Sequence, residues 1–392
     1  MQDITGLIHH PYLPPDGFEA PQPGVFKAST VFFPHVAAMR AREWKDKTAY
    51  TYGLHGTPTT YLLEERLCAL EGGQQCLLVP SGLAAIALVS LSLLKTGDEV
   101  LIPDNAYGPN KSLAAAELKQ WGISHRTYNP MDAADLAAKL SPSTKLVWLE
   151  VPGSVTLEFP HLPALVVACR EKGVTTALDN TWGAGLAFKP FEFGVDLTIH
   201  ALTKYPSGGG DVLMGSVVTV NEALHLRLKL THMRLGLGVG ANDVEAVLRA
   251  LPSIALRYAA QDQACRSLAT WLTTQPEVAQ VLHPALPGSP GHEHWKVVCQ
   301  DDMAAGLLSI VFKPAFSTAQ VDAFCDALKL FRIGYSWGGP ISLVVPYEIA
   351  SMRTPGMTTG VLPGAVVRLA IGLEDVRDLQ ADLAQAMHAL RA

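Results

Sequence analysis

A lysine that closely follows a largely apolar run is the residue whose type and position most clearly suggest chemistry. Lys204 comes two residues after the strand-like run Val195–Leu202, and glycines follow soon after it. A lone ammonium is costly to desolvate, so it must be paired, have a shifted pKa, or be bonded covalently. An aldehyde cofactor would give the third outcome through a Schiff base, and Thr203 could offer its hydroxyl to a phosphate. Taken alone, a lysine in this position is more often an ordinary loop residue.

Two further motifs could bind parts of such a cofactor. The run Pro80-Ser81-Gly82-Leu83 opens a predicted helix, whose free N–H groups and positive dipole end favour a phosphate. Asp179 ends a predicted strand, where a carboxylate could hold a pyridine nitrogen in its protonated form. Each has an ordinary alternative, a serine N-cap for the first and a turn or cap aspartate for the second.

An aromatic residue and an arginine complete the set of candidates. Tyr107 follows a predicted strand and could stack on a flat ring, or it could be a loop tyrosine packed on its neighbours. Arg368 lies inside the apolar strand Val366–Ile371, where a guanidinium suits bidentate binding of an α-carboxylate. The alternative for Arg368 is an edge-strand charge that faces water. Together these residues supply what pyridoxal 5′-phosphate (PLP) chemistry on amino acids requires.

The elements that must position these residues alternate regularly along the chain. Short Val-, Leu- and Ile-rich runs are separated by stretches with helical periodicity, which predicts an α/β fold with a mostly parallel, seven-stranded sheet covered on both faces. In such sheets ligands bind beyond the carboxyl ends of the strands. That rule places several segments on one rim: Ser81, Asp104–Tyr107, Glu150–Ser154, Asp179–Trp182 and Thr203–Lys204.

Three parts of the chain differ in pattern. Residues 1–52 are rich in proline, as in His10-Pro-Tyr-Leu-Pro-Pro, and carry apolar side chains without local partners, so we expect an arm for subunit contacts. Residues 53–250 hold the alternating pattern and form the expected PLP-binding domain. Residues 251–392 mix strands and helices, which predicts a smaller α+β domain. The stretch Asn242–Gln275 is expected to join the two, as one long helix or as a pair kinked at Pro252.

Composition excludes several classes of function. The chain has 392 residues, of which 48% are hydrophobic and 17% charged, and its net charge of −6 is spread without a basic run. We therefore expect a globular protein that binds no nucleic acid. The longest apolar run, Leu83–Leu94, is too short to cross a bilayer, and the N-terminus lacks the pattern of a signal peptide. Six scattered cysteines without a Cys-x-x-Cys pair predict neither a metal site nor a disulfide framework, and they favour a cytoplasmic location.

The sequence resembles the cysteine/methionine-metabolism family of fold-type I PLP-dependent enzymes over nearly its whole length and, within that family, the bacterial cystathionine β-lyases. The resemblance is carried by these stretches: Leu70-Glu-Gly-Gly73, Pro152-Gly-Ser154, Leu178-Asp-Asn-Thr-Trp182, Ala201-Leu-Thr-Lys-Tyr205, His283-Pro-Ala-Leu-Pro-Gly288, Tyr335-Ser-Trp-Gly-Gly339 and Arg368-Leu-Ala-Ile-Gly-Leu-Glu374. Asp179 and Lys204, 25 residues apart, form a specific pair. The tryptophan at position 337 is more specific, because β-lyases carry it where the γ-class enzymes usually have leucine.

The resemblance implies a role for each candidate residue. Lys204 would bind PLP as a Schiff base and later transfer the substrate's proton, Asp179 would pair with the ring nitrogen, and Tyr107 would stack on the ring. The expected phosphate ligands are Gly82, Leu83, Thr203 and, from a neighbouring subunit, Tyr52. The expected ligands of the substrate carboxylate are Arg368, Ser336 and Trp337. The family implies a homotetramer built from two catalytic dimers.

This chain departs from the family at the phosphate site. The crossing segment of the family usually reads Tyr-x-Arg, whereas here Leu54 stands in place of the arginine. His55 could replace the guanidinium as a phosphate ligand, or it could be a buried or dimer-contact histidine. Ala201 stands where many relatives have a serine that also touches the phosphate. Either the affinity for PLP is lower than in relatives, or the phosphate pocket is rebuilt.

The leading hypothesis for the function is β-elimination from an amino-acid thioether such as cystathionine, giving a thiol, pyruvate and ammonia. A second hypothesis keeps PLP but has γ-elimination or γ-replacement as the reaction, as in cystathionine γ-lyase, cystathionine γ-synthase or methionine γ-lyase. Trp337 disfavours that reaction. A third hypothesis is a regulatory protein that binds PLP without catalysis. Leu54 is the support for it, and the retained Lys204, Asp179 and Arg368 count against it.

Overall fold

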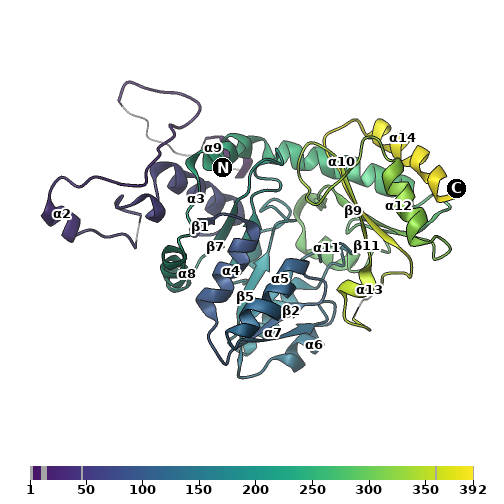
Figure 1. The fold of residues 1–392 in the computed structure, drawn as a ribbon, viewed down its shortest axis with the longest axis horizontal. Coiled ribbons are helices and arrows are strands. Elements are labelled where there is room, and N and C mark those ends of the chain that lie inside the picture. Colours follow the sequence, from purple (N-terminus) through teal and green to yellow (C-terminus); the bar gives the residue numbers. More distant parts are fainter. Residues whose placement is uncertain (1–2, 10–15, 46, 358–359, 392) are drawn as a thin grey trace.

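Two β-sheets, one of seven strands and one of five, organise the chain in the computed structural model (Figure 1). The structure describes residues 3–9, 16–45, 47–357 and 360–391. The proline-rich run 10–15, part of the basis for the predicted arm, lies outside these residues. The expected α/β class, with a seven-stranded and mostly parallel sheet and a smaller second sheet, is confirmed.

The seven-stranded sheet has the spatial order β1-β7-β6-β5-β4-β2-β3. Its strands are β1 (Gln75–Val79), β2 (Glu99–Pro103), β3 (Ser124–Tyr128), β4 (Thr144–Glu150), β5 (Thr175–Asp179), β6 (Leu197–Ala201) and β7 (Gly215–Thr219). Strands β3, β2, β4, β5 and β6 run parallel, whereas β7 is antiparallel to both of its neighbours. Only the loop 202–214 separates β7 from β6. A connection without a crossover helix suits antiparallel pairing.

Helices cover both faces of this sheet, which suits the largely apolar sequences of interior strands such as β2 and β4. One face packs against α3 (Pro58–Glu71), α6 (Ala133–Lys139), α7 (Leu162–Glu171) and α9 (Ala241–Ala250). The other face packs against α4 (Gly82–Leu93), α5 (Gly108–Leu113), the π-helical turn η2 (Ala114–Leu118) and α8 (Glu222–Leu235). Side chains alternate between the two cores along β1, since Leu78 enters the first core and Leu77 and Val79 enter the second.

The five-stranded sheet has the order β10-β11-β12-β9-β8. Its strands are β8 (Val278–Leu282), β9 (Leu307–Phe312), β10 (Arg332–Ile333), β11 (Leu343–Tyr347) and β12 (Val366–Ala370). It packs against α10 (Ile254–Leu272), α12 (Thr318–Ala327) and α14 (Val376–Ala386). Because β12 lies between β11 and β9, Arg368 is in an interior strand, so the alternative of an edge-strand charge is wrong.

The predicted helical stretch Asn242–Gln275 is a kinked pair rather than one helix. Helices α9 and α10 are separated by the 3-10 turn η4 (Leu251–Ser253), which contains Pro252. All strands of the first sheet lie before this kink and all strands of the second lie after it. The domain limits at 53–250 and 251–392 stay a prediction.

The N-terminal segment lies mostly outside the two cores. Helix α1 (Asp3–Ile8) buries Leu7 in the first core, whereas the part that carries α2 (Val36–Arg40) projects from the body of the molecule (Figure 1). Large apolar side chains there are exposed, with Phe32 at 92%. The remaining short elements are η1 (Gly53–His55), η3 (Pro190–Phe193), α11 (His292–Val298), η5 (Gln300–Asp302), α13 (Ile349–Met352) and η6 (Met387–Arg391). Within the described residues, every helix is too short or too polar to cross a membrane.

Candidate active site

Lys204 lies in the loop after β6, at the carboxyl end of the large sheet, and its side chain faces the second sheet. Its Nζ donates a hydrogen bond of 2.8 Å to Ser336 Oγ and lies 5.6 Å from the centroid of the Trp337 ring. Ser336 and Trp337 belong to the connection between β10 and β11. The structure therefore brings Lys204 together with two candidate residues that lie more than 130 positions later in the chain.

The surroundings of Lys204 shift its amine toward the neutral form. Burial, together with the positive charge of Arg368, lowers the pKa of Lys204 from 10.5 to about 8, against the opposing effect of Asp179. An amine with this pKa is partly unprotonated near neutral pH. It can therefore act as a nucleophile or a general base without a further partner.

Asp179 ends β5, which neighbours β6 in the sheet. Its Oδ1 accepts hydrogen bonds from the backbone N–H of Thr181 at 3.0 Å and from the Thr181 hydroxyl at 2.5 Å. Burial raises the pKa of Asp179, while Thr181, His200 and Lys204 act in the opposite direction. A half-buried carboxylate with few donors is suited to accept one more, such as the N–H of a protonated pyridine.

Tyr107 precedes α5, and a half-buried acid fixes its backbone. The N–H of Tyr107 donates a 2.7 Å hydrogen bond to Glu150 Oε2, at the end of β4. Burial raises the pKa of Tyr107, and the nearby Asp179 and Glu150 raise it further, so its phenol stays protonated. Burial and the charge of Asp179 also raise the pKa of Glu150. Glu150 lay on the predicted rim but was not singled out, although it shares with Asp179 the position of an acid that ends an apolar strand.

Arg368 is a buried cation on β12 whose head group faces the same region. Its side chain packs on Tyr347, with the guanidinium carbon 5.4 Å from the ring centroid. Among the residues that the structure describes, no carboxylate forms an ion pair with Arg368. A buried guanidinium without an acidic partner is costly unless a ligand supplies the negative charge. This arrangement suits the binding of a substrate carboxylate between Arg368 and Lys204.

The start of α4 lies directly against the end of β6. Ser81 caps the helix by accepting a 3.0 Å hydrogen bond from the N–H of Ala84. A Cβ atom on Gly82 would sit 2.7 Å from the Cβ of Ala201, so only glycine fits there. In the described part of the chain, the N–H groups of Gly82 and Leu83 have no acceptor. They lie beside the loop that carries Thr203, whose Oγ1 makes long contacts of 3.3–3.4 Å with the backbone of Met214.

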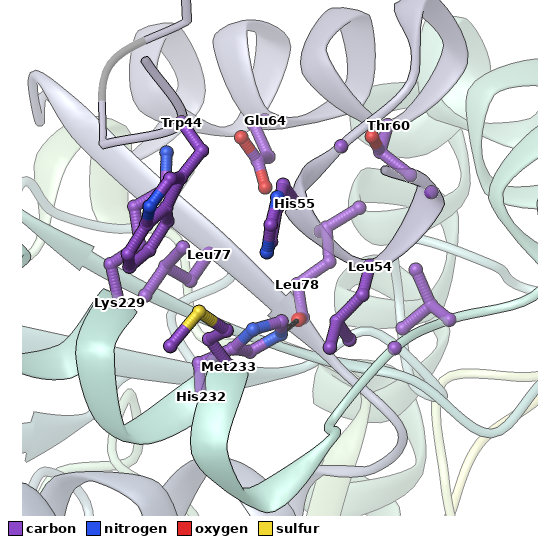
Figure 2. A pocket seen from close by; sticks show the side chains of 14 residues that line it. Trp44, Leu54, His55, Thr60, Glu64, Leu77, Leu78, Lys229, His232 and Met233 are labelled. Atoms are coloured by element: carbon purple, nitrogen blue, oxygen red, sulfur yellow. Dashed lines mark hydrogen bonds between the residues drawn. The ribbon is translucent and has the colours of Figure 1, made fainter. Parts of the chain in front are cut away.

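The two candidates from the crossing segment point elsewhere. Tyr52 is 45% exposed, and Figure 2 shows His55 in a pocket of its own chain between Trp44 and Leu54. The His55 ring stacks on Trp44 at 5.0 Å, and its Nδ1 lies 2.8 Å from the Thr51 hydroxyl. Burial and the positive charges around this pocket lower the pKa of His55. Nothing in the described residues connects Tyr52 or His55 to the Lys204 site of the same chain, and their roles toward a neighbouring subunit stay predictions.

These residues fit PLP as a group. The amine of Lys204, the carboxylate of Asp179 and the ring of Tyr107 surround one region at the carboxyl ends of β4, β5 and β6. The unpaired amides at the start of α4 are suited to the phosphate. The described residues include no group of three or more histidine, cysteine, aspartate or glutamate side chains placed to bind a metal ion.

Comparison with known proteins agrees with this geometry. Residues 4–388 match the family described as "Cys/Met metabolism PLP-dependent enzyme". Cystathionine beta-lyase MetC of Escherichia coli is 37% identical over 363 residues, which cover 91% of each chain. An L-alanine/L-glutamate racemase of Wolbachia pipientis is 33% identical over 93% of this chain and 92% of its own length.

The crystal structure of cystathionine gamma synthase from Xanthomonas oryzae pv. oryzae is similar across the whole fold. Its TM-score is 0.89 at 29% identity, and the match covers 100% of this chain and 99% of the other. The names of these three related proteins give three different activities, so the likeness fixes the family rather than the reaction. On the match over residues 4–388 and the relatives above, the chain belongs to the Cys/Met metabolism family of PLP-dependent enzymes.

Proposed function

We propose that this PLP-dependent enzyme is a carbon–sulfur β-lyase. Its substrate would be cystathionine or a related cysteine thioether, and its products a thiol such as homocysteine, pyruvate and ammonia. The observation that carries the proposal is the position of the Lys204 amine beside the aromatic ring of Trp337 and the cationic Arg368. Its amine lies 2.8 Å from Ser336 Oγ and 5.6 Å from the Trp337 ring, with Arg368 close enough to lower its pKa.

The substrate would be oriented by its carboxylate. Arg368 lies in a buried interior strand and provides two parallel N–H donors in a plane, which matches a carboxylate. Ser336 is beside Lys204, so the same carboxylate would lie within reach of its hydroxyl or backbone. Fixing this group directs the Cα–H bond of the substrate toward the amine of Lys204.

Lys204 would act as the general base at Cα. Bound PLP supplies an electron-withdrawing ring that stabilises negative charge on Cα, and Asp179 supports this by keeping the ring nitrogen protonated. A base works best when its pKa is close to the working pH, and the pKa of Lys204 is about 8. Tyr107 would stack on the ring and keep it in place.

The leaving sulfur needs a proton as the C–S bond breaks. Tyr107 is a suitable donor because its raised pKa keeps the phenol protonated, and the proton taken by Lys204 is a second source. Loss of the α-proton and of the thiolate leaves an enamine. Released into water, this enamine becomes an imine and is hydrolysed to pyruvate and ammonia, so one water molecule is consumed for each thioether cleaved.

Trp337 supports β-elimination over the γ-class reactions. Its ring packs on Tyr205, next to Lys204 in the chain, at a centroid distance of 5.5 Å. The bulk of this ring beside the amine limits the space for substrate movement that a second proton transfer, at the β-carbon, would need. The β-lyase relative from Escherichia coli, with matched coverage of 91% in both chains, supports the same choice.

Product analysis tests the reaction. The purified protein, supplied with PLP, is incubated with cystathionine, and the keto acids and thiols are identified by mass spectrometry. We expect pyruvate and homocysteine. Cysteine with 2-oxobutyrate would show γ-elimination instead, and binding of PLP without turnover of any cysteine thioether would favour a regulatory protein. Lys204→Ala should abolish turnover and the visible band that borohydride reduces, whereas Lys145→Ala, on the exposed surface, should not.

Racemisation is the second candidate, favoured by the Wolbachia pipientis relative. It also begins with removal of the α-proton, and it differs only in that a proton returns to the opposite face of Cα. Incubating L-alanine and L-glutamate with the protein and separating the enantiomers distinguishes the two activities. We expect β-elimination from a thioether to be faster by at least about tenfold, because racemisation also requires a proton to be delivered to the opposite face of Cα, beyond the step that Lys204 would catalyse.

We also propose that the enzyme is a homotetramer of two catalytic dimers. The apolar side chains on the projecting N-terminal segment support this, since Phe32 and Val36 are exposed at 92% and 57%. A single chain that exposes such groups gains stability by covering them with a second copy. In the dimer, Tyr52 would contact the phosphate of PLP in the neighbouring subunit. Sedimentation analysis of the full chain tests the oligomeric state. Titration of the wild type and of Tyr52→Ala with PLP tests the contact of Tyr52 with the phosphate.

A further inference from the structure

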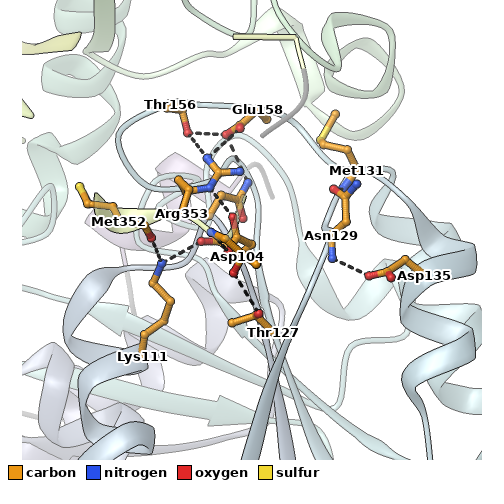
Figure 3. Close-up of polar contacts among 12 residues, drawn as sticks. Asp104, Lys111, Thr127, Asn129, Met131, Asp135, Thr156, Glu158, Met352 and Arg353 are labelled. Carbon is orange, nitrogen blue, oxygen red and sulfur yellow. Dashed lines mark hydrogen bonds and ion pairs between the residues drawn. The ribbon is translucent and has the colours of Figure 1, made fainter. Parts of the chain in front are cut away.

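Arg353 joins the C-terminal part of the chain to the end of the large sheet. It follows α13, and its guanidinium reaches two buried acids, Asp104 and Glu158 (Figure 3). Its Nε donates a 2.6 Å hydrogen bond to Asp104 Oδ2, and its Nη1 donates one of 2.9 Å to Glu158 Oε1. A third bond, also of 2.9 Å, runs from Nη1 to Thr156 Oγ1. One side chain thus connects three segments of the fold.

The residues on either side of Arg353 are fixed to the same place. Thr354 donates its backbone N–H to Asp104 Oδ1 at 2.9 Å. Lys111, on α5, donates to the carbonyl oxygens of both Asp104 and Met352, at 2.9 Å and 2.5 Å. Each of the residues 352–354 therefore forms a hydrogen bond with the turn after β2 or with α5. A shift of this segment along its length would break all of these bonds at once.

The large-sheet partners of Arg353 lie close to the candidate active site. Asp104 precedes Tyr107 by three residues, in the turn that leads from β2 to α5. The neighbouring Asn105 accepts a 2.8 Å hydrogen bond from Ser154 N–H through its carbonyl. The same turn carries Tyr107, whose ring would stack on PLP.

The other end of the same segment lies at the substrate side of the site. Tyr347 ends β11, six residues before Arg353, and its ring packs on Arg368. Arg353 is therefore the fixed point between the Tyr107 turn on one sheet and the Tyr347–Arg368 pair on the other. The distance between these two sides determines whether ring stacking and carboxylate binding occur in one geometry.

The charge and burial of this cluster indicate a role in geometry. The side chain of Arg353 is 5% exposed, and the carboxylates of Asp104 and Glu158 are 1% and 0% exposed. Buried ion pairs contribute little net stability, because desolvation offsets most of their attraction, but they are strict about distance and direction. The two acids are matched in charge by two cations, Arg353 and Lys111. Such an arrangement specifies one relative position of the two sheets.

We propose that Arg353 is a positioning residue that sets the spacing between the Tyr107 turn and the Tyr347–Arg368 pair, and through it the affinity for the amino-acid substrate. The proposal rests on the proposed function, because it takes Tyr107 and Arg368 as the two sides of the substrate site. Arg353 itself touches neither of these residues. It acts through Asp104 on one side and through the segment 347–354 on the other.

The test compares Arg353→Gln and Arg353→Lys with the matched control Arg377→Gln, whose side chain is 86% exposed on α14. Hydrogen exchange of the protein without PLP is followed in peptides that cover residues 104–113 and 343–357. We expect faster exchange in both regions for Arg353→Gln and no change for the control. Arg353→Lys keeps the positive charge but loses the planar set of N–H donors, so we expect an intermediate rate. Unchanged exchange in residues 104–113 would overturn the proposal.

Kinetics with the preferred thioether provide the second readout. We expect KM to rise by about tenfold in Arg353→Gln, with kcat changed much less, because the two sides of the site would be misplaced before the chemistry begins. A purely structural role predicts a lower Tm with an unchanged KM, and that result would overturn the proposal. If the wild-type protein cleaves no thioether, the proposed function fails, while the exchange measurement still decides whether Arg353 fixes the two segments.

Discussion

The hydroxyl of Ser336 accepts a 2.8 Å hydrogen bond from the amine of Lys204, and Ser336 does so from a backbone conformation with φ of 136°. Residues other than glycine rarely adopt this conformation, since the side chain is strained there. The strain places a hydroxyl from the smaller sheet against the lysine of the larger one. Backbone strain of this kind is more common at functional sites than elsewhere.

Two substitutions at position 336 separate the hydroxyl from the strain. Ser336→Ala and Ser336→Gly both remove the hydrogen bond to Lys204, so we expect kcat to fall by about tenfold in each. Glycine tolerates a positive φ, so Ser336→Gly should be more stable than Ser336→Ala by ~1 kcal/mol. Steady-state kinetics and denaturant unfolding check the two parts. A Ser336→Ala protein with the wild-type kcat would show that the hydroxyl has no part in the reaction.

The pH dependence of PLP binding follows from the pKa of Lys204. Only the neutral amine attacks an aldehyde, and the pKa of about 8 makes that form the minority below pH 8. The rate at which the unloaded protein binds PLP covalently should therefore fall by about tenfold for each pH unit below 8 and level off above it. Stopped-flow absorbance of the Schiff base measures this rate.

Arg368 provides the control for that profile. Its charge is one of the two causes that lower the pKa of Lys204, and burial is the other. In Arg368→Met the pKa of Lys204 should rise, and the inflection of the rate should move to higher pH while its shape is retained. An inflection that stays at pH 8 would mean that burial alone sets the pKa.

Tyr107 has two separable properties, its ring and its hydroxyl. Tyr107→Phe keeps the ring, so we expect PLP affinity close to that of the wild type but a lower kcat, because the protonated phenol that would donate to the leaving sulfur is lost. Tyr107→Ala loses both and should also bind PLP about tenfold more weakly. Titration of the unloaded protein with PLP measures the affinity. Equal affinity for all three proteins would exclude stacking by Tyr107.

Asp104 makes the stability depend on pH in the acid range. Burial raises its pKa, but hydrogen bonds from Arg353 and Thr354 outweigh burial and leave the pKa of Asp104 below its usual value. A carboxyl whose folded-state pKa is below the unfolded value of about 3.9 stabilises the fold above that pH, and the contribution is lost as the pH falls through the folded-state pKa. We therefore expect Asp104→Asn to be less stable than the wild type by ~3 kcal/mol at pH 7.

That difference should begin to shrink as the pH is lowered below about 4, where Asp104 takes up a proton in the unfolded chain, and should be lost as the pH falls through the lower folded-state pKa. Denaturant unfolding of both proteins at pH 7 and at the lowest pH at which they stay folded measures it. Asp322→Asn, an exposed position on α12, serves as the control and should show no such dependence. A difference that is constant with pH would show that Asp104 is not charged in the folded state.

The sequence allowed the large sheet and its rim to be predicted because the apolar strands are short and regularly spaced. Lys204, Asp179 and Tyr107 each follow or end such a strand, and the ends of neighbouring parallel strands meet in space. The direction of β7 was not predictable in the same way, because a strand buried on both faces has no alternation that reveals its partner or its orientation. Arg368 was placed in a strand, but its interior position depends on β11, which was not predicted as a strand.

Glu150 and Arg353 show where reasoning from the sequence ends. Glu150 accepts a hydrogen bond from the backbone N–H of Tyr107. Because the donor is a backbone group, the type of the donating residue does not reveal the bond. Arg353 pairs with an acid that is 249 positions away, in a loop with neither helical nor strand periodicity. Contacts at this separation depend on the docking of two sheets, and a single sequence does not encode that docking in any local pattern.

The division of the site between two sheets has a consequence for the newly made protein. Lys204 and Asp179 leave the ribosome well before Ser336, Arg353 and Arg368. Because domains are formed in order from the N-terminus during synthesis, the amine is in place while the groups that face it have yet to be translated. A nascent chain halted near residue 300 would thus lack both the arginine whose charge helps to lower the pKa of Lys204 and the serine that binds its amine, so the lysine would become reactive only after the second sheet is made.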